Sequence, residues 1–490
     1  MEALDWLVIG VFFLALIGII VWVVRQKQND SADYFLGGRD ATWLAIGASI
    51  FASNIGSEHL IGLAGAGASS GMAMAHWEIQ GWMILILGWV FVPFYTRSMV
   101  YTMPEFLERR YNPQSRTILS VISLVSYVLT KVAVTVYAGG LVFQQVFGIK
   151  ELWGIDFFWI AAIGLVVLTA LYTIFGGMKS VLYTSVLQTP ILLLGSLIIL
   201  VLGFKELGGW DEMMRVCGAV TVNDYGDTMT NLIRSNDDAN FPWLGALIGS
   251  AIIGFWYWCT DQFIVQRVLS GKNEMEARRG TIFGAYLKLL PVFLFLIPGM
   301  IAFALHQKYI GAGGEGFLPM LANGTANADA AFPTLVAKLL PAGVKGLVVC
   351  GILAALMSSL ASLFNSSAML FTIDFYKRFK PETPEKKLVG IGQIATIVIV
   401  VLGILWIPIM RSVGDVLYTY LQDVQSVLAP GIAAAFLLGI CWKRTSAQGG
   451  MWGLISGMVI GLTRLGAKVY YSNAGEVADS TFKYLFYDMN

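Results

Sequence analysis

Polar and ionisable residues interrupt an apolar segment near the start of the chain. The stretch Phe51–Leu63 places Asn54, Glu58 and His59 inside a run that is long enough to cross a membrane. Ionisable groups are costly in hydrocarbon, so they usually mark a ligand or ion pathway. Gly56 lies beside them and lets a helix open and expose its backbone oxygens. Such an opened helix is tolerated only where it lines a cavity, so this segment predicts a binding site within the membrane.

Two later apolar segments each carry a single charge. Glu78 lies between Trp77 and Trp82, and Lys288 follows Tyr286 in a stretch of leucines. A charge inside the bilayer needs a partner in the helix bundle. We expect Glu78 and Lys288 to serve the binding site, and a purely structural ion pair is the alternative.

The composition indicates which class of protein holds these residues. The chain has 490 residues, of which 57% are hydrophobic and 13% are charged, whereas a soluble protein carries about a quarter charged residues. Apolar runs recur along the whole length, so we expect one polytopic, all-α membrane domain over residues 1–490. The formal charge of +1 gives no support for nucleic acid as a partner, and the lipid bilayer is the expected surrounding.

Apolar runs long enough to span the bilayer predict about twelve helices. They fall near residues 5–24, 41–68, 76–98, 117–147, 154–173, 176–203, 242–269, 276–306, 345–376, 387–410, 414–441 and 450–470. The first run follows an acidic start, so we interpret it as a retained helix rather than a cleaved signal. Most basic residues fall on one side of this alternating arrangement, which predicts a multi-pass plasma-membrane protein with its N-terminus outside.

The helices divide into two sets of five when the first and last are left aside. The expected repeats cover about residues 41–203 and 242–441, with extra helices at about 5–24 and 450–470. An odd number of helices per repeat inverts the second repeat. Each repeat also opens on an interrupted helix, which is the pattern of a binding site between inverted repeats.

Three stretches give the chain a family resemblance. They are Tyr172–Ser180, Trp256–Asn273 and Leu356–Asn365, and they resemble the sodium/solute symporter family, most closely its sodium/glucose cotransporters. The similarity runs from about residue 33 to about 470. It implies a five-plus-five inverted-repeat (LeuT-like) transporter fold and sodium-driven uptake. Such proteins usually continue into one or two further helices, so we expect either a shortened member or part of a longer chain.

The resemblance also implies the substrate site. A sugar needs charged and amide groups for its hydroxyls and an aromatic ring for its apolar face. The implied substrate-binding residues are Asn54, His59, Glu78, Tyr257, Lys288 and Gln422. Tyr257 is also the implied inner gate, and Leu63, Trp77 and Tyr418 occupy the outer-gate positions. Packing roles remain the alternative for His59 and for the aromatic residues.

The implied co-transported ion is sodium, a hard cation that takes oxygen ligands. By resemblance, its ligands are backbone oxygens of Ala52, Ile55 and Ala355 and the hydroxyls of Ser358 and Ser359. Paired serines in a membrane helix also occur simply for helix packing. No organic cofactor is implied.

The chain departs from its relatives at two positions. Ser185 stands where relatives usually carry Asp, and Ala361 stands where members with a second sodium tend to have a hydroxyl residue. We therefore expect one sodium per sugar. Asp261, Arg267 and Lys131 are expected to form ion pairs at a gate or a helix end.

The sequence thus predicts sodium-coupled symport of a hexose, glucose or galactose, into the cell by alternating access. A symporter of myo-inositol or another small polyol is one alternative, and a sodium-gated sugar sensor is another. An enzyme is not expected, because the three histidines form no metal-ligand or Ser/His/Asp arrangement. The sequence leaves the oligomeric state open.

Overall fold

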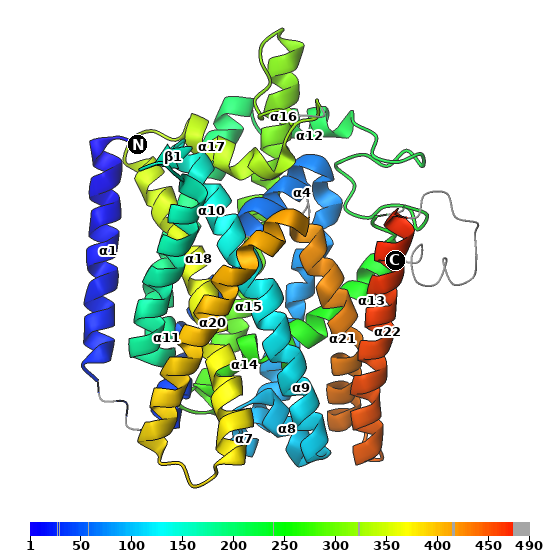
Figure 1. Cartoon of the computed structure of the whole chain (residues 1–490). Helices are drawn as coiled ribbons and strands as arrows, with labels where there is room; N and C mark the ends of the chain where they lie inside the picture. The colour runs from blue at the N-terminus through cyan, green and yellow to red at the C-terminus, as the bar shows by residue number, and fades with distance from the viewer. Residues whose placement is uncertain are drawn as a thin grey trace.

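Long helices, most of them running between the two ends of the molecule, make up the computed structural model of the protein (Figure 1). The structure describes residues 1–473 apart from 27, 29, 57, 239, 322–323 and 414–416. The side chains of 129, 409–413, 417–423, 468–469 and 472–473 also lie outside the described part. Within these limits, nine helices are long and apolar enough to cross a membrane, which confirms the prediction of an all-α polytopic membrane protein.

The first half of the chain forms an outer helix and the first predicted repeat. Its helices are α1 (Ala3–Val24), α2 (Ser31–Leu36), α3 (Trp43–Asn54), α4 (Ala64–Ser69), α5 (His76–Ile79), α6 (Met83–Ile86), α7 (Val92–Ser98), α8 (Met103–Arg110), α9 (Pro113–Ser126), α10 (Ala133–Phe147), α11 (Phe157–Leu207) and α12 (Trp210–Gly218). Wider π turns and short 3₁₀ turns join several of them, so Gly71–Ser98 and Pro113–Phe147 each run as one helix. The only strands in the described residues, β1 (Glu151–Leu152) and β2 (Ile155–Asp156), form a short antiparallel hairpin.

The second half of the chain holds the second predicted repeat and a final helix. Its helices are α13 (Trp243–Gly254), α14 (Gln262–Leu269), α15 (Glu274–Leu287), α16 (Ile297–Gly311), α17 (Ala331–Leu339), α18 (Val344–Met369), α19 (Lys377–Phe379), α20 (Glu385–Val413), α21 (Leu417–Cys441) and α22 (Ala447–Asn473). A 3₁₀ turn, η9 (Ala328–Ala330), precedes α17.

Gly177 accounts for part of the difference between nine long helices and the twelve predicted spans. It lies within the 51 residues of α11 with φ 53° and ψ −148°, which is a break in the helix. Glycine adopts this backbone conformation readily, and a side chain there would strike the carbonyl of Tyr34. The break separates the spans predicted at 154–173 and 176–203. The predicted span 41–68 is interrupted too, and α3 contributes only 12 residues before its break.

Both predicted helix interruptions are present. α3 ends at Asn54, and Ile55 has an extended backbone with φ −78° and ψ 104° before a π turn resumes at Glu58. In the second repeat, α13 continues through the π turn Phe255–Thr260, and Asp261 is extended with φ −72° and ψ 126° before α14 begins. Each break frees backbone groups from the helical ladder in the middle of a helix.

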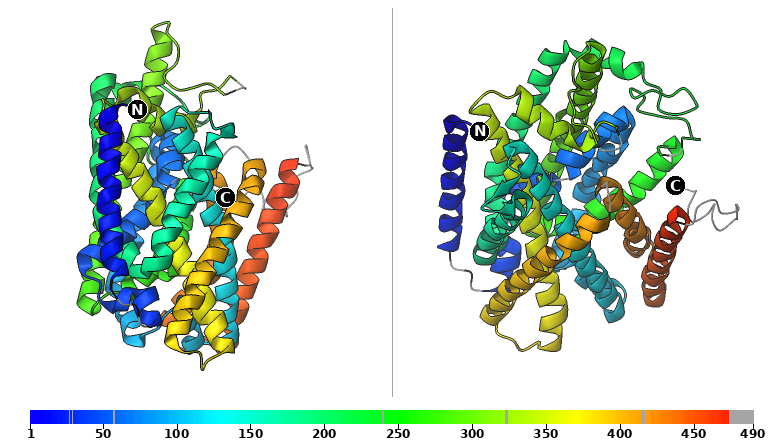
Figure 2. Two further views of the ribbon diagram at one scale, coloured as in Figure 1. Left: turned by 60° about the vertical axis from the view of Figure 1, so that its left-hand side comes forward. Right: turned by 45° about the horizontal axis from the view of Figure 1, so that its top comes forward.

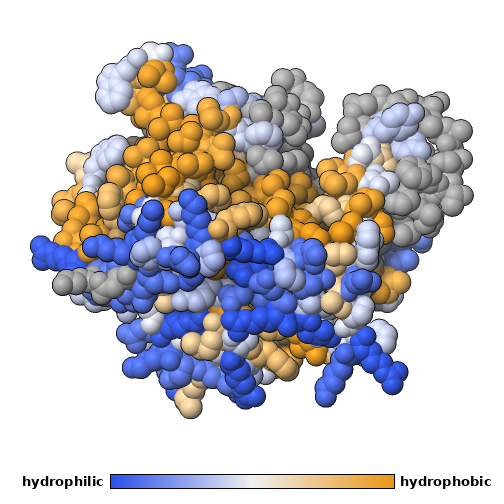
Figure 3. Space-filling view, turned by 60° about the horizontal axis from the view of Figure 1, so that its bottom comes forward, coloured by the Kyte–Doolittle hydropathy of each residue, from blue (hydrophilic) through white to orange (hydrophobic). Residues whose placement is uncertain are grey.

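The segments predicted to share one side of the membrane lie together at one end of the bundle. Arg39 donates to the carbonyl of Val100, and Arg116 pairs with Asp374. Viewed from the end opposite the N-terminus, hydrophilic side chains cover much of the surface (Figure 3). The N-terminus lies at the other end, near β1 and α17, and α12 lies at the same end across the bundle (Figure 1). The grouping of the segments matches the alternating arrangement, and the orientation in the membrane stays a prediction.

The core of the bundle surrounds α18. In the most apolar 18-residue stretch of this span, about 89% is buried inside the protein, whereas only 22% of the corresponding stretch of α1 is buried. α1 and α22 lie at opposite edges of the bundle in the views of Figure 2. α3 and α11 pack against α18, so the first broken helix is held against the helix that carries Ser358 and Ser359.

Candidate substrate and ion site

Three buried ionisable side chains meet beside the first helix break. Lys288 Nζ lies 2.6 Å from Glu78 Oε2 and 2.8 Å from His59 Nε2, and His59 Nε2 lies 3.2 Å from Glu78 Oε1. His59 comes from the π turn after the break, Glu78 from α5, and Lys288 from the end of α15. Glu78 and Lys288 were each predicted to need a buried partner, and the structure pairs them with each other.

The imidazole of His59 keeps one polar atom available. Its Nε2 cannot accept a hydrogen bond from Lys288 and donate one to Glu78 at the same time, so the tautomer selects one of the two. Its Nδ1 is buried and has no partner among the described residues. In either tautomer, Nδ1 presents a donor or an acceptor that a hydroxyl group satisfies.

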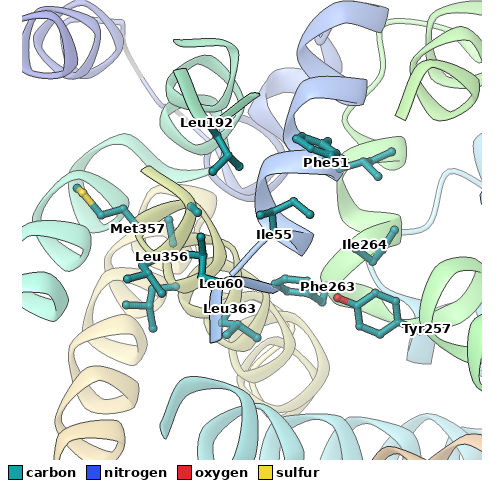
Figure 4. Close-up of a cluster of buried hydrophobic side chains, with 14 of the residues drawn as sticks. Phe51, Ile55, Leu60, Leu192, Tyr257, Phe263, Ile264, Leu356, Met357 and Leu363 are labelled. Atoms are coloured by element: carbon teal, nitrogen blue, oxygen red, sulfur yellow. The ribbon is translucent and has the colours of Figure 1, made fainter. Parts of the chain in front are cut away.

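The two helix breaks are joined by a single hydrogen bond. Asn54 Nδ2 donates to Tyr257 Oη over 3.0 Å, and Asn54 Oδ1 is buried without a partner in the described part of the chain. Figure 4 shows the Tyr257 ring close to Phe263, with Ile55 and Leu60 lining the neighbouring apolar region. The ring centroids of Tyr257 and Phe263 are 6.3 Å apart. An amide and an aromatic ring, one from each repeat, therefore face the same region.

A small cavity lies between these groups. Its lining residues are Asn54, Glu58, His59, Trp77, Glu78, Gln80, Tyr257, Trp258, Lys288 and Gln425. The structure brings together five of the six predicted substrate-binding residues, and the side chain of the sixth, Gln422, lies outside the described residues. The cavity measures about 30 Å³, whereas ligand pockets usually measure about 300 Å³ or more. The surrounding helices must separate before a solute fits.

Four lining residues were missed by sequence reasoning. They are Glu58, Gln80, Trp258 and Gln425. Gln425 lies one helical turn after Gln422 on α21, so the helical period alone pointed to it. Gln80 Oε1 is buried without a partner among the residues that the structure describes, and its spacing of two from Glu78 gave no signal, because residues two apart on a helix do not face each other. Glu58 was visible as an ionisable residue at the break but was not assigned to the site.

The predicted outer-gate residues occupy different environments. Trp77 lines the cavity, and its ring centroid lies 5.0 Å from that of His76. Leu63 is fully buried at the end of the π turn that carries His59. The side chain of Tyr418 lies outside the described residues. Their roles as gates stay predictions.

An ion pair lies beside Tyr257. Lys131 Nζ is 2.7 Å from Asp261 Oδ2, and the same ammonium lies 4.6 Å from the centroid of the Tyr257 ring. Tyr127 Oη also donates to Asp261. The expected pairing of Lys131 with Asp261 is confirmed. The expectation for Arg267 was wrong, because its guanidinium contacts serine hydroxyls and no carboxylate among the described residues.

The predicted sodium ligands gather where α18 meets the first break. Ser359 Oγ donates to the carbonyl of Ser53 over 2.7 Å and lies 3.4 Å from the carbonyl of Ile55. Ser358 Oγ lies 3.3 Å from Ser185 Oγ. Ala52 and Ala355 are buried on α3 and α18.

These groups are hydroxyl and carbonyl oxygens, which are the ligands a hard cation prefers. A second small cavity lies next to the first, since Asn54, Glu58 and Tyr257 line both, and Ser359 lines the second. The donor set therefore fits sodium. The coordination itself remains a prediction.

Comparison with known proteins places this geometry in a family. The model of the sodium:solute symporter family matches residues 34–457. The sodium/myo-inositol cotransporter 2 of Homo sapiens is 38% identical over 479 residues, which cover 95% of this chain and 70% of that protein. The sodium/glucose cotransporter 4 of Danio rerio is 37% identical over 482 residues, covering 95% of this chain and 72% of that protein.

A solved structure supports the fold. A Na⁺-coupled sialic acid symporter in a substrate-bound, outward-open state matches with a TM-score of 0.77 and 21% identity, over 94% of this chain and 98% of that one. The predicted LeuT-like fold is therefore confirmed. The chain belongs to the sodium:solute symporter family, whose members are sodium-coupled membrane transporters and not enzymes.

Proposed function

We propose that this protein imports a hexose, glucose or galactose, together with one sodium ion. The observation that carries the proposal is the buried triad of Glu78, Lys288 and His59, which shares one cavity with Asn54 and Tyr257. Charged and amide groups suit the hydroxyls of a sugar, and the aromatic rings suit its apolar face.

The contacts of Ser359 support coupling between ion and sugar. Its hydroxyl contacts the carbonyl of Ser53, directly before Asn54, and approaches the carbonyl of Ile55, directly after it. A sodium ion held by these oxygens fixes the backbone around Asn54. Because Asn54 holds Tyr257, ion binding then favours the arrangement of the site that receives the sugar.

Alternating access follows from the paired breaks. The hydrogen bond between Asn54 and Tyr257 and the ion pair of Lys131 with Asp261 lie between the two repeats. We propose that these contacts separate when the site opens to the cytoplasm, in a plasma membrane with the N-terminus outside. The sodium gradient drives the cycle because sodium binds in the state that admits sugar.

Myo-inositol is the second candidate substrate. It is supported by the similarity to sodium/myo-inositol cotransporters, which is 38% identity over 95% of this chain for the Homo sapiens protein. Myo-inositol offers a ring of hydroxyls but has neither a ring oxygen nor a hydroxymethyl group. The triad meets the hydroxyls of both compounds, so a direct comparison decides between them.

Counterflow in proteoliposomes tests the proposal. Vesicles that contain the purified protein are loaded with unlabelled solute. The entry of labelled glucose, galactose, myo-inositol or mannitol is then measured in a buffer that contains either sodium or choline. Sodium-dependent entry of glucose or galactose in excess of myo-inositol is the expected result. Preference for myo-inositol would replace the hexose assignment. Sodium-dependent currents without counterflow of any of these compounds would indicate a sensor.

A further inference from the structure

An apolar groove runs between α1 and α11 at the edge of the bundle (Figure 1). Its α1 side is a single helical face, which includes Phe13, Leu16 and Ile20 at spacings of three and four residues. Leu171 and Phe175 belong to its α11 side. The groove measures about 430 Å³, which lies within the usual range of ligand pockets. A groove of this composition at the periphery of a membrane protein predicts an apolar occupant from the bilayer.

The length of the groove matches one leaflet of a bilayer. From Phe13 to Arg25 it follows α1 for about 18 Å, at 1.5 Å per helical residue. One leaflet supplies half of a hydrocarbon core that is about 30 Å thick. An acyl chain that begins at the Arg25 end therefore fits along the groove within a single leaflet.

The Arg25 end of the groove carries positive charge. Arg25 lines the groove and is exposed, directly after the last residue of α1. Lys179 Nζ donates to Gln26 Oε1 over 3.0 Å, which places a second cation beside the same end. Neither cation forms an ion pair within the described residues. A negatively charged headgroup would supply the missing counter-charge.

Aromatic rings indicate that this end of the groove lies at the level of the headgroups. Trp22 packs edge-on against Tyr183, with ring centroids 5.0 Å apart, and Trp22 is about half exposed. Tryptophan and tyrosine gather at membrane–water interfaces, because each ring has an apolar body and a polar atom. Basic residues at this level attract anionic lipids.

The floor of the groove lies against the helix that carries the proposed sodium ligands. Tyr172 and Met357 close the groove from α11 and α18, and each is 1% exposed. Tyr172 Oη donates to the carbonyl of Met357 over 2.9 Å. Met357 directly precedes Ser358 and Ser359 on α18. An acyl chain over this floor therefore restricts the segment that holds the two serines.

We propose that the groove between α1 and α11 binds an anionic phospholipid, whose acyl chain lies over Met357 and whose headgroup pairs with Arg25 and Lys179. The bound lipid steadies α18 and thereby raises the affinity for sodium. This second step rests on the proposed function, because it takes Ser358 and Ser359 as sodium ligands. The lipid site itself stands independently of that function.

Native mass spectrometry of the detergent-purified protein tests the headgroup contact. Phosphatidylglycerol and phosphatidylcholine with the same acyl chains are compared, so only the headgroup differs. The wild type should bind phosphatidylglycerol at least about tenfold more tightly, because each basic side chain near an anionic headgroup contributes about a factor of five. Arg25→Gln should reduce this preference about fivefold. Lys386→Gln removes an exposed cation that does not line the groove and should keep the preference.

Filling the groove tests the acyl-chain contact. Ile17 and Leu14 are both exposed apolar residues of α1, but only Ile17 lines the groove. Ile17→Trp should weaken the binding of both lipids at least about tenfold, because the acyl chain loses its apolar contacts. Leu14→Trp should leave binding unchanged. Leu171→Trp fills the groove from α11 and replaces Ile17→Trp if that variant does not fold.

Three results would overturn the lipid site. They are equal binding of the two lipids to the wild type, a preference that Arg25→Gln leaves unchanged, and equal effects of Ile17→Trp and Leu14→Trp. A protein dimer that Ile17→Trp dissociates would also overturn it, because the groove would then be occupied by a second copy of the chain.

Binding of ²²Na⁺ to the protein in nanodiscs tests the second step. The wild type should bind sodium about fivefold more tightly in phosphatidylglycerol than in phosphatidylcholine, which is a modest coupling between two sites. An anionic membrane surface also concentrates sodium by itself, so the decisive comparison is with variants in the same lipid. Ile17→Trp should lose the gain, and Leu14→Trp should keep it.

The two measurements separate this inference from the proposed function. If phosphatidylglycerol binds as expected but Ile17→Trp and Leu14→Trp bind sodium equally well, the coupling to α18 is wrong and the lipid site stands. If the wild type binds no sodium in either lipid, the proposed function fails. The lipid site, which is measured without sodium, is then unaffected.

Discussion

Asn54 donates a 3.0 Å hydrogen bond from Nδ2 to Tyr257 Oη and so ties the first helix break to the second. Asn54 is the last residue of α3, and Tyr257 lies in the π turn that precedes Asp261. The two residues contact each other across the two repeats, and both line the same cavity. A change at either one therefore acts on substrate contact and on the relation between the repeats.

Tyr257→Phe separates these two contributions. It keeps the ring and removes the hydroxyl, leaving the Asn54 amide without this partner. The loss of one buried hydrogen bond costs about 1 kcal/mol, so apparent substrate affinity in counterflow should fall about fivefold. Tyr257→Ala also removes the ring and should lower affinity further. Equal affinity in the wild type and Tyr257→Phe would show that the hydroxyl plays no part in closing the site.

The Glu78–Lys288 pair predicts a separation between stability and binding. Glu78→Gln leaves a buried ammonium without its carboxylate, and breaking a buried pair typically costs about 3–5 kcal/mol. Thermal unfolding should therefore shift to lower temperature, and substrate affinity should fall at least about tenfold.

The double variant Glu78→Gln/Lys288→Met removes both charges. It should regain most of the thermal stability of the wild type, since no uncompensated charge remains, while substrate affinity stays low. Recovery of both properties would reduce the pair to a structural role, which was the alternative left open by the sequence.

Ser359 and Ser367 offer a matched comparison on α18. Ser359 contacts the carbonyls at the first break, whereas the buried Ser367 Oγ has no hydrogen-bond partner. Ser359→Ala should raise the sodium concentration for half-maximal transport at least about tenfold and change substrate affinity at saturating sodium much less. Ser367→Ala should leave both unchanged. Parallel losses of sodium and substrate affinity in Ser359→Ala would indicate packing alone.

Much of the architecture followed from the sequence because membrane burial makes exceptions conspicuous. Lone charges such as Glu78 and Lys288 required buried partners, and the pair is present at 2.6 Å. The polar stretch after Asn54 predicted a helix break, and Ile55 is extended there. Both predictions rest on local signals, because one polar residue in an apolar run is enough to indicate a buried partner or a helix break.

Arg267 shows where sequence reasoning stopped. A buried arginine suggested an ion pair, but its partners are Ser49 and Ser53 on another helix. Serine is frequent in membrane helices and gives no distance information. Gln425 was missed although it lies one helical turn after Gln422 on α21, a spacing that could have pointed to it. Local patterns reveal which residues need partners, and the packing of helices selects the partners.

The proposed single ion site predicts the stoichiometry of transport. One sodium ion would carry one charge with each sugar, and a charge crossing 100 mV releases about 2.3 kcal/mol. A tenfold sodium gradient adds about 1.4 kcal/mol, so the sum supports about a 500-fold accumulation of sugar. The reversal potential of the sugar-dependent current in sealed vesicles should give one charge per sugar. Two charges per sugar would reveal a second ion site.

Asp329 predicts a pH dependence at the outer end of the first broken helix. It lies in η9 against Gly65 of α4, where a side chain carbon added to the glycine would come within 3.1 Å of Asp329 Cα. Burial raises the pKa of Asp329 to about 6, above its ordinary value of 3.8. The folded protein therefore holds this proton more tightly than the unfolded chain does. Below about pH 4 both states are protonated, and the cost of ionisation grows as the pH rises through 6.

Lowering the pH from 7.5 to 5.5 should accordingly stabilise the wild type more than Asp329→Asn. A carboxyl with a pKa of about 6 rather than 3.8 loses at most about 3 kcal/mol on ionisation, so Asp329→Asn should be the more stable protein at pH 7.5 by up to that amount. Thermal unfolding at several pH values measures both effects. Glu315→Gln removes an exposed carboxyl from the same outer loop and serves as the control. Parallel pH profiles for the wild type and Asp329→Asn would show that the Asp329 carboxyl ionises without cost against α4.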